Sequence, residues 1–177
     1  MTSLRRPLFA AAAALVAFAA TARAQMPESY RELQVRMLET ERNMILHMID
    51  SMPSQYFREK ATPAQRDFGQ QLYHAAVAVK NISAHFMGAP AATYPDTAAG
   101  FDKASLRAFV GNVYDAAVSF ARSEPAADRE TMITFFGSQM PKWQVWDELH
   151  EHTMWTLGQT VANFRMHGMP PAAFMFF

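Results

Sequence analysis

The chain has 177 residues, of which half are hydrophobic, 16 are basic and 16 are acidic. Three of the basic residues lie in the first 24 positions and every acidic residue follows them, so the rest of the chain carries a formal charge of −3. A weakly acidic chain without a basic cluster has no electrostatic footprint for nucleic acid or anionic lipid. The absence of cysteine excludes disulfides, thiol nucleophiles and cysteine-ligated zinc.

Residues 1–24 have the pattern of a secretory signal peptide. Two arginines precede an apolar run, and Ala22-Arg23-Ala24 supplies small residues at the cleavage position. We expect cleavage after Ala24 rather than retention as an anchor, because the run is short for a bilayer span of roughly 20 residues. The expected product is an exported, periplasmic protein with no membrane contact after cleavage, in which residues 25–177 form one domain.

The next part of the chain predicts two long helices. The first begins at Pro27 and stops before Pro53. The second is expected to begin at Thr62-Pro63, with Thr62 as N-cap and Gln65 completing a capping box. Its apolar residues keep the helical period to about Phe86, and the helix is expected to end at Gly88.

The remainder predicts two further long helices after a long loop over residues 89–102. Asp102 can cap the third helix, which Glu124-Pro125 breaks, and residues 126–141 fit a short helix or an irregular crossing. The last helix runs from Lys142 to about His167. These features predict an all-α fold, a four-helix bundle whose second and third helices are joined by a connection long enough to cross over.

The last predicted helix carries two histidines on different faces. His150 and His152 lie about 200° apart around a helix, so they cannot serve one site together. His152 shares a line with Leu149 and Thr156, which continues to Gln159, whereas His150 is expected at the surface. Gly158, in mid-helix, costs up to about 1 kcal/mol relative to alanine, which predicts close packing of a neighbouring helix there.

The second predicted helix offers His74 as a partner for His152. Metal sites in bundles are built from side chains on facing helices, although a single histidine on an apolar face is more often a hydrogen-bonded core residue. His85 lies about 16 Å further along the same helix and cannot bind the same ion. His47, in the first helix, is expected to be a boundary residue. The apolar C-terminus, "PPAAFMFF", is expected either to dock on the bundle or to form an exposed patch.

The C-terminal segment "HTMWTLGQTVANFRMHGMPP" resembles the signature of the DinB/YfiT-like proteins, the damage-inducible four-helix-bundle family. It supplies the histidine, Gly-Gln, arginine, glycine and Pro-Pro of that signature, with the histidine at His152. The segment "FGQQLYHAAVAVKNISAHFMGAP" is similar to the second helix of the family and places that helix's histidine at His74. The connector "IDSMPSQYFREKATPAQRDFG" resembles that of exported members.

The resemblance implies a divalent-metal site from which one ligand is missing. Members of the family commonly bind zinc or nickel through three histidines, one from the second helix and two from the last helix at i and i+4. The last of these positions is Thr156 here, and a threonine hydroxyl is a poor ligand for zinc or nickel. Glu148 is an alternative third ligand to His74 and His152. Without it, the two histidines are expected to hold a buried polar cluster with Thr156, for which Gln159 is a further candidate member.

Two function classes follow from the resemblance. The first is an exported, non-catalytic or stress-response domain with a partly degenerate metal site, acting as a homodimer. The second is a metal-dependent hydrolase or a thiol transferase that uses His74, His152 and Glu148. No paired carboxylates, phosphate-binding loop or Ser-His-Asp arrangement favours another chemistry.

Overall fold

The computed structural model describes residues 27–90, 102–173 and 175. The predicted signal peptide and nearly all of the predicted loop over residues 89–102 lie outside these ranges. Within them, no helix combines the length and the apolar character needed to cross a membrane.

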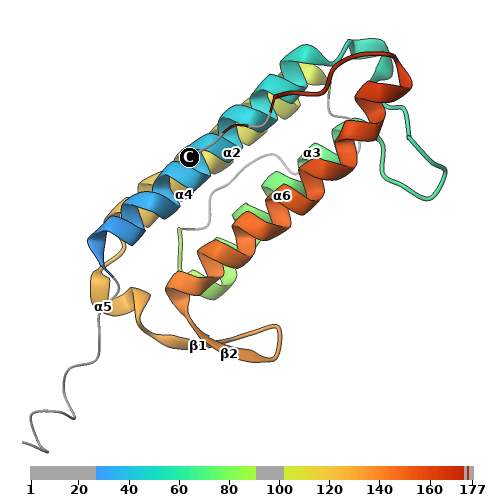
Figure 1. Ribbon diagram of the computed structural model, residues 1–177. Coiled ribbons are helices and arrows are strands. Elements are labelled where there is room, and N and C mark those ends of the chain that lie inside the picture. The colour runs from blue at the N-terminus through green and yellow to red at the C-terminus, as the bar shows by residue number, and fades with distance from the viewer. Residues whose placement is uncertain (1–26, 91–101, 174, 176–177) are drawn as a thin grey trace, which may run out of the picture.

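Four long helices make up the bundle, as predicted (Figure 1). They are α2 (Glu28–Ser51), α3 (Phe68–Ile82), α4 (Lys103–Ser123) and α6 (Lys142–Met166). A short 3-10 turn, η1 (Ser54–Tyr56), follows α2, and one π-helical turn, η2 (Ser83–Met87), extends α3. A single-turn helix, α5 (Ala126–Arg129), and a hairpin of β1 (Met132–Phe135) and β2 (Ser138–Pro141) join α4 to α6. These two strands were not predicted.

The helix directions follow from which residues meet. Helices α2 and α4 are antiparallel, because Arg42 pairs with Asp115 whereas Asp50, later in α2, pairs with Arg107. Helices α3 and α6 are also antiparallel. In that pair the start of α3 lies against the end of α6, where Phe68 meets Phe164 edge to face.

The other neighbours run in parallel. Gln34 and Met48 of α2 contact Trp143 and Thr160 of α6 in the same order along both helices. Helix α3 runs parallel to α4, and Figure 1 shows both descending toward the hairpin. The end of α3 and the start of α4 therefore lie at opposite ends of the bundle, in agreement with the expected crossover.

Helix α3 begins five residues later than predicted. Asp67 is its N-cap: one carboxylate oxygen accepts the backbone N–H of Gln70 at 2.7 Å, and the Gln70 side chain accepts the backbone N–H of Asp67 at 3.2 Å. Thr62 instead opens a turn, in which its carbonyl accepts the N–H of Gln65. Both segments have a capping residue followed three positions later by Gln, and only Asp67 directly precedes the buried residues of the helix.

The start of α3 is fixed by close packing against the connector. A Cβ on Gly69 would lie 3.1 Å from the Phe57 ring, so a larger residue would displace that ring. The Phe57 ring also meets Phe68 edge to face. Arg58 pairs with the buried Asp67 carboxylate at 3.2 Å. These contacts hold the first turn of α3, and hence the helix that carries His74, in one position.

The hairpin turn has an unusual residue. Phe136 has φ 44° and is followed by Gly137 with φ 90°, the backbone of a two-residue hairpin turn. Such a turn usually takes Asn, Asp or Gly at its first central position. The Phe136 side chain is 76% exposed and lies beside Phe86 and Phe135.

The described part of the C-terminal tail docks on the bundle. Gly168 has φ 66° and ends α6, and Met169, Ala172 and Met175 then pack against the core. His167 stacks on Tyr56 with ring centroids 3.5 Å apart. Of the two expectations for this tail, these residues satisfy the docked one.

Candidate metal centre

His74 of α3 and His152 of α6 meet between the two antiparallel helices. Their Nε2 atoms lie 3.3 Å apart, and their ring centroids lie 5.1 Å apart at an interplanar angle of 67°. Both rings are half-buried. The predicted meeting of these two imidazoles is therefore observed, although they are 78 residues apart in sequence.

The separation of the two nitrogens suits one metal ion. Two imidazole nitrogens bound tetrahedrally to zinc, each at roughly 2.0–2.1 Å, lie about 3.3 Å apart. The same separation is also within reach of a hydrogen bond in which one ring nitrogen donates and the other accepts. The pair thus fits two ligand positions of a tetrahedral ion as well as it fits a direct hydrogen bond.

The protonation state of the pair also suits a metal. Burial, the positive charge of Arg66 and the neighbouring His152 lower the pKa of His74. Burial and Arg66 likewise lower the pKa of His152. Neutral imidazole is the form that ligates metals, so both rings are in the binding form at neutral pH.

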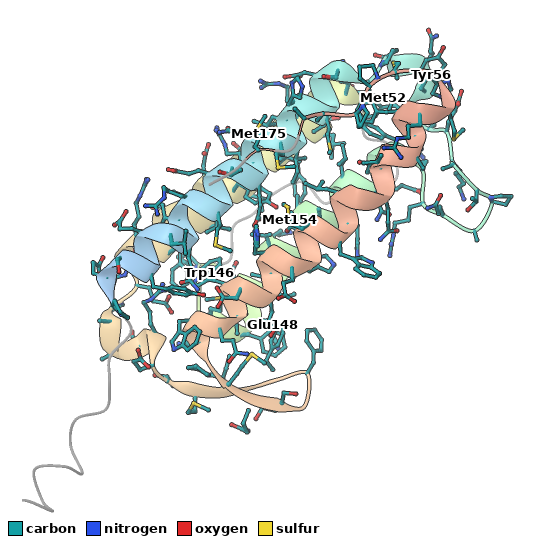
Figure 2. All side chains as sticks on the ribbon, in the orientation of Figure 1. Met52, Tyr56, Trp146, Glu148, Met154 and Met175 are labelled. Carbon is teal, nitrogen blue, oxygen red and sulfur yellow. The ribbon has the colours of Figure 1, made fainter. Side chains whose placement is uncertain are left out.

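A third protein ligand does not join the pair. Among the described residues, no three His, Cys, Asp or Glu side chains are grouped so that they could hold a metal ion. Figure 2 places Glu148 toward the hairpin end of α6, with Met154 further along the helix. The Glu148 carboxylate accepts the side-chain amide of Gln144 at 3.5 Å.

Thr156 stands where the third histidine was expected. It is buried, and its backbone carbonyl accepts the side-chain amide of Gln71 at 3.4 Å. Gln71 precedes His74 by almost one turn of α3. Thr156 therefore lies about one turn from the imidazole pair, where α3 packs against α6. Gln159 is half-buried. Of the candidate ligands predicted from the sequence, only the two imidazoles lie together in the described residues.

The second ring nitrogen of His152, the one that points away from His74, is not hydrogen-bonded within the described residues. This atom, Nδ1, is buried. A metal-bound histidine usually donates this second N–H to a carboxylate or a carbonyl, which fixes the ring. The His152 ring is therefore oriented by packing and by the contact of its Nε2 atom with His74.

His150 was expected at the surface, and this prediction is wrong. Its Nδ1 atom lies 2.5 Å from an oxygen of Glu41, a residue of α2 that is 1% exposed. The expectation failed because α6 has two buried faces. One faces α3 and carries His152, and the other faces α2 and carries His150 and Thr153. The prediction that the two histidines serve different sites is confirmed.

A buried polar cluster, formed by Glu41, Tyr114, His150 and Thr153, fills the centre of the bundle. The Tyr114 hydroxyl lies 3.4 Å from that of Thr153. Burial raises the pKa of Glu41, while the hydrogen bond and charge of His150 and both hydroxyls oppose that rise. Burial and the nearby Glu41 raise the pKa of Tyr114 well above its usual range.

The sequence analysis missed Glu41 and Tyr114. The available signal was a carboxylate in the apolar stripe of the first helix, between Met37 and Met44. An ionisable residue on such a face needs a partner on the facing helix.

The other histidines lie away from the pair. His47 is exposed at a groove beside the C-terminal tail. His85 is exposed on η2 and packs edge to face against Phe86. Neither joins a metal-binding group within the described residues.

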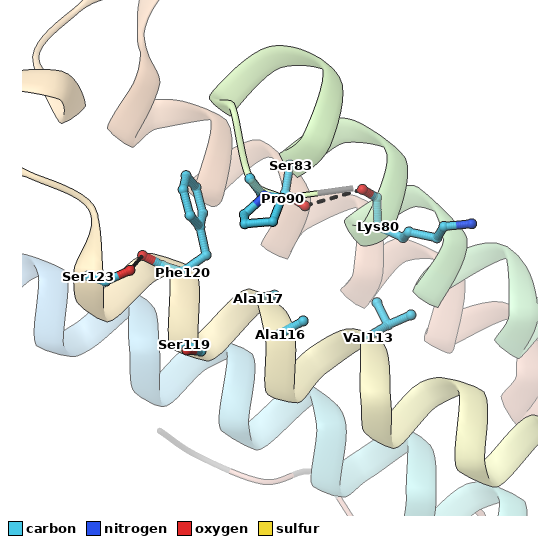
Figure 3. A pocket seen from close by; sticks show the side chains of 10 residues that line it. Lys80, Ser83, Pro90, Val113, Ala116, Ala117, Ser119, Phe120 and Ser123 are labelled. Atoms are coloured by element: carbon cyan, nitrogen blue, oxygen red, sulfur yellow. Dashed lines mark hydrogen bonds between the residues drawn. The ribbon is translucent and has the colours of Figure 1, made fainter. Parts of the chain in front are cut away.

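Apart from the histidine pair, an open concavity lies between α3 and α4 (Figure 3). Its floor is formed by small side chains of α4, including Ala116, Ala117 and Ser119. The Ser83 and Ser123 hydroxyls at its walls are hydrogen-bonded to carbonyls of their own helical segments. The surface is mainly apolar, so the concavity is a poorer candidate for chemistry than the histidine pair.

Comparison with known proteins gives structural neighbours only. No protein-family model matches the sequence, and no curated protein matches it. A DinB-like protein from Bacillus cereus ATCC 10987 is similar in structure with a TM-score of 0.68 and 20% sequence identity, over 81% of this chain and 97% of that one.

The second neighbour is YfiT from Bacillus subtilis, a probable metal-dependent hydrolase with an unusual four-helix bundle topology. The TM-score is 0.65 and the identity 10%, over 83% of this chain and 93% of YfiT. At these identities the likeness defines the fold. The chain has the four-helix bundle fold of the DinB/YfiT-like proteins, which confirms the resemblance noted in the sequence at the level of structure.

Proposed function

We propose that this protein is an exported DinB-like bundle that binds a divalent metal, zinc or nickel, through His74 and His152. The observation that carries the proposal is the 3.3 Å separation of the two Nε2 atoms between facing helices. The lowered pKa of both imidazoles supports it, because the metal then competes little with protons at neutral pH.

The proposed site differs from a complete catalytic centre by one ligand. Catalytic zinc sites usually have three protein ligands and an open position, whereas here Thr156 replaces the third. A bound ion would have more than one position open to water or to another molecule, and its affinity would be lower than in a three-histidine site. YfiT, with the same fold, is a probable metal-dependent hydrolase. Hydrolysis, in which a metal lowers the pKa of bound water, is therefore the second candidate function.

Metal titration of the purified protein tests the proposal. Chelator-treated protein is titrated with zinc and with nickel by calorimetry, alongside His74→Ala, His152→Ala and the control His85→Ala. We expect about one ion per chain, affinity weaker by about tenfold or more in the two site variants, and no change in the control. Circular dichroism verifies that each variant is folded. Equal affinity in folded His74→Ala, His152→Ala and unmodified protein would refute the proposed site.

A further inference from the structure

The described C-terminal tail, residues 168–173 and 175, turns back from the end of α6 and runs across α2 (Figure 1). It borders a groove whose lining combines tail residues 169–172 with His47 and Ser51 of α2 and Phe164 of α6. Phe164 is 1% exposed. The tail therefore covers apolar surface beside both helices.

Side-chain burial holds the tail in place. Met169 donates its backbone N–H to the Phe164 carbonyl at 3.0 Å. Beyond Met169, no described tail residue makes a backbone hydrogen bond with another described residue. The tail residues that pack against the core are Met169, Ala172 and Met175. Because alanine buries little apolar area, docking of the tail depends mainly on the two methionine side chains.

The thioethers of these two methionines are accessible to solvent in the folded protein. Met169 and Met175 are half-buried, whereas Met48 and Met52 of the core are 3% and 0% exposed. The chain has no cysteine, so methionine thioethers are its only sulfur groups open to a mild oxidant. A small oxidant can therefore reach the anchors of the tail while the core methionines stay protected.

Oxidation changes what the two anchors contribute to docking. Methionine sulfoxide is polar, and its formation disrupts apolar contacts that a thioether makes. Burying the new oxygen without a hydrogen-bond donor costs free energy. Met132 and Met166 are 47% and 49% exposed, so the same oxidation at those positions leaves the new oxygen in water. The effect on structure is therefore expected at the tail anchors.

We propose that the tail is a redox-sensitive strap, docked while Met169 and Met175 are thioethers and released when a peroxide oxidises them. In each reaction a sulfur lone pair attacks one peroxide oxygen and the O–O bond breaks. The proton of the transferred oxygen goes to the other oxygen, which leaves as water. The sulfur loses two electrons, the peroxide gains them, and the product is the sulfoxide. Release of the tail uncovers the groove at His47 and Phe164, whether or not the imidazole pair holds a metal.

The absence of cysteine allows the tail to be labelled at one position. Ala173→Cys, at an exposed tail residue, carries a fluorophore whose time-resolved anisotropy shows whether the tail rotates with the bundle or independently. The labelled protein is treated with hydrogen peroxide, and mass spectrometry quantifies the sulfoxide at each methionine. Two double variants carry the same label: Met169→Leu with Met175→Leu, and the control Met132→Leu with Met166→Leu. Leucine keeps the apolar volume and does not form a sulfoxide.

Peroxide is expected to abolish the slow rotation of the label in the protein with all its methionines and in the control, but not in Met169→Leu with Met175→Leu. A methionine sulfoxide reductase with a thiol reductant is expected to restore docking. Met169→Gln with Met175→Gln, which places a polar group at both anchors, is expected to release the tail without peroxide. Circular dichroism verifies that the bundle stays folded in every sample.

Three results would overturn the proposed strap. The first is unchanged anisotropy after both anchors have become sulfoxides. The second is equal release in Met169→Leu with Met175→Leu, which would place the effect elsewhere. The third is anchors that stay reduced while Met132 and Met166 are oxidised. None of these measurements involves zinc or nickel, so they test the strap separately from the proposed function.

Discussion

At the scale of single residues, the candidate site depends on three positions where α3 packs against α6. His74 and His152 supply imidazole nitrogens at a separation that suits one ion, and Thr156 occupies the next turn of α6. Because positions i and i+4 lie on the same helix face, an imidazole at Thr156 would point toward the same region as His152. The difference from a three-histidine site is thus confined to one side chain.

Replacing Thr156 by histidine is expected to raise zinc affinity by about tenfold or more, because a third imidazole adds a ligand that threonine cannot supply. Calorimetric titration measures the change. Because Thr156 is buried, thermal unfolding of the metal-free protein measures how much the larger histidine side chain destabilises the fold. The matched control is Thr160→His, one turn further along. Equal zinc affinity in folded Thr156→His and unmodified protein would mean that a histidine at position 156 does not reach the ion bound by His74 and His152.

At the same scale, the prediction of close helix packing at Gly158 is wrong. It was expected at a close helix contact, but it is exposed, and a Cβ built on it would meet nothing within 4 Å. The sequence could not show this, because a glycine inside a helix is consistent with close packing or with none.

Gly158→Ala is expected to stabilise the protein by about 0.5–1 kcal/mol, because alanine restricts the unfolded chain and has the higher helix propensity. Urea unfolding at neutral pH measures the difference. Gly69→Ala is the contrasting variant, expected to destabilise because its Cβ would press on the Phe57 ring. A loss of stability in Gly158→Ala would imply a contact that the described residues do not make.

At the scale of elements, the sequence predicted the four long helices and most of their ends. Asp102 caps α4 as expected, accepting the backbone N–H of Ser105 at 2.7 Å. The start of α3 was misplaced because two capping patterns stand within six residues. The hairpin was missed because its turn is Phe136-Gly137, without the Asn-Gly or Asp-Gly pair that marks such turns.

Mutation of Asp67 and of Thr62 distinguishes which of the two residues is the N-cap of α3. Asp67→Ala is expected to destabilise the protein by about 1–2 kcal/mol, because it removes the N-cap acceptor and the partner of Arg58. Thr62→Ala is expected to change stability by less than about 0.5 kcal/mol, because Thr62 contributes only a backbone carbonyl to its turn. Chemical unfolding of both variants measures the contrast, and similar effects in the two would contradict the observed start of α3.

At the scale of the whole molecule, the sequence indicated how many helices there are but not which ones are neighbours. The helical pattern offered His74 as a candidate partner for His152, and only the family resemblance indicated that their two helices, α3 and α6, face each other. The buried polar cluster needs the contact between α2 and α6, and no local pattern reveals it. The apolar periodicity of α6 was assigned to one face, although the helix packs against two partners.

Stability is expected to fall as the metal-free protein is acidified. A histidine whose folded-state pKa is lowered stabilises the fold fully above its unfolded pKa, here 6.5, and this contribution is lost as the pH falls through the folded-state pKa. Glu41 acts in the opposite direction, because its raised pKa favours the folded state at low pH.

The test compares the metal-free protein with the His74→Gln, His152→Gln double variant, so that the contribution of Glu41 is the same in both. Urea unfolding is measured from pH 8 down to pH 5 with chelator present. We expect the unmodified protein to lose more stability over this range than the double variant. Parallel pH profiles would show that the two imidazoles have ordinary pKa values in the fold.

The arrangement of α3 against α6 sets when the site can form. His74 is synthesised 78 residues before His152, and the second imidazole comes from the last helix of the described chain. A nascent or truncated chain that ends before α6 contains three of the four long helices and only one of the two imidazoles. Metal capture through this pair would therefore require α6 to be in place, and a bound ion would mark chains in which α3 and α6 have packed together.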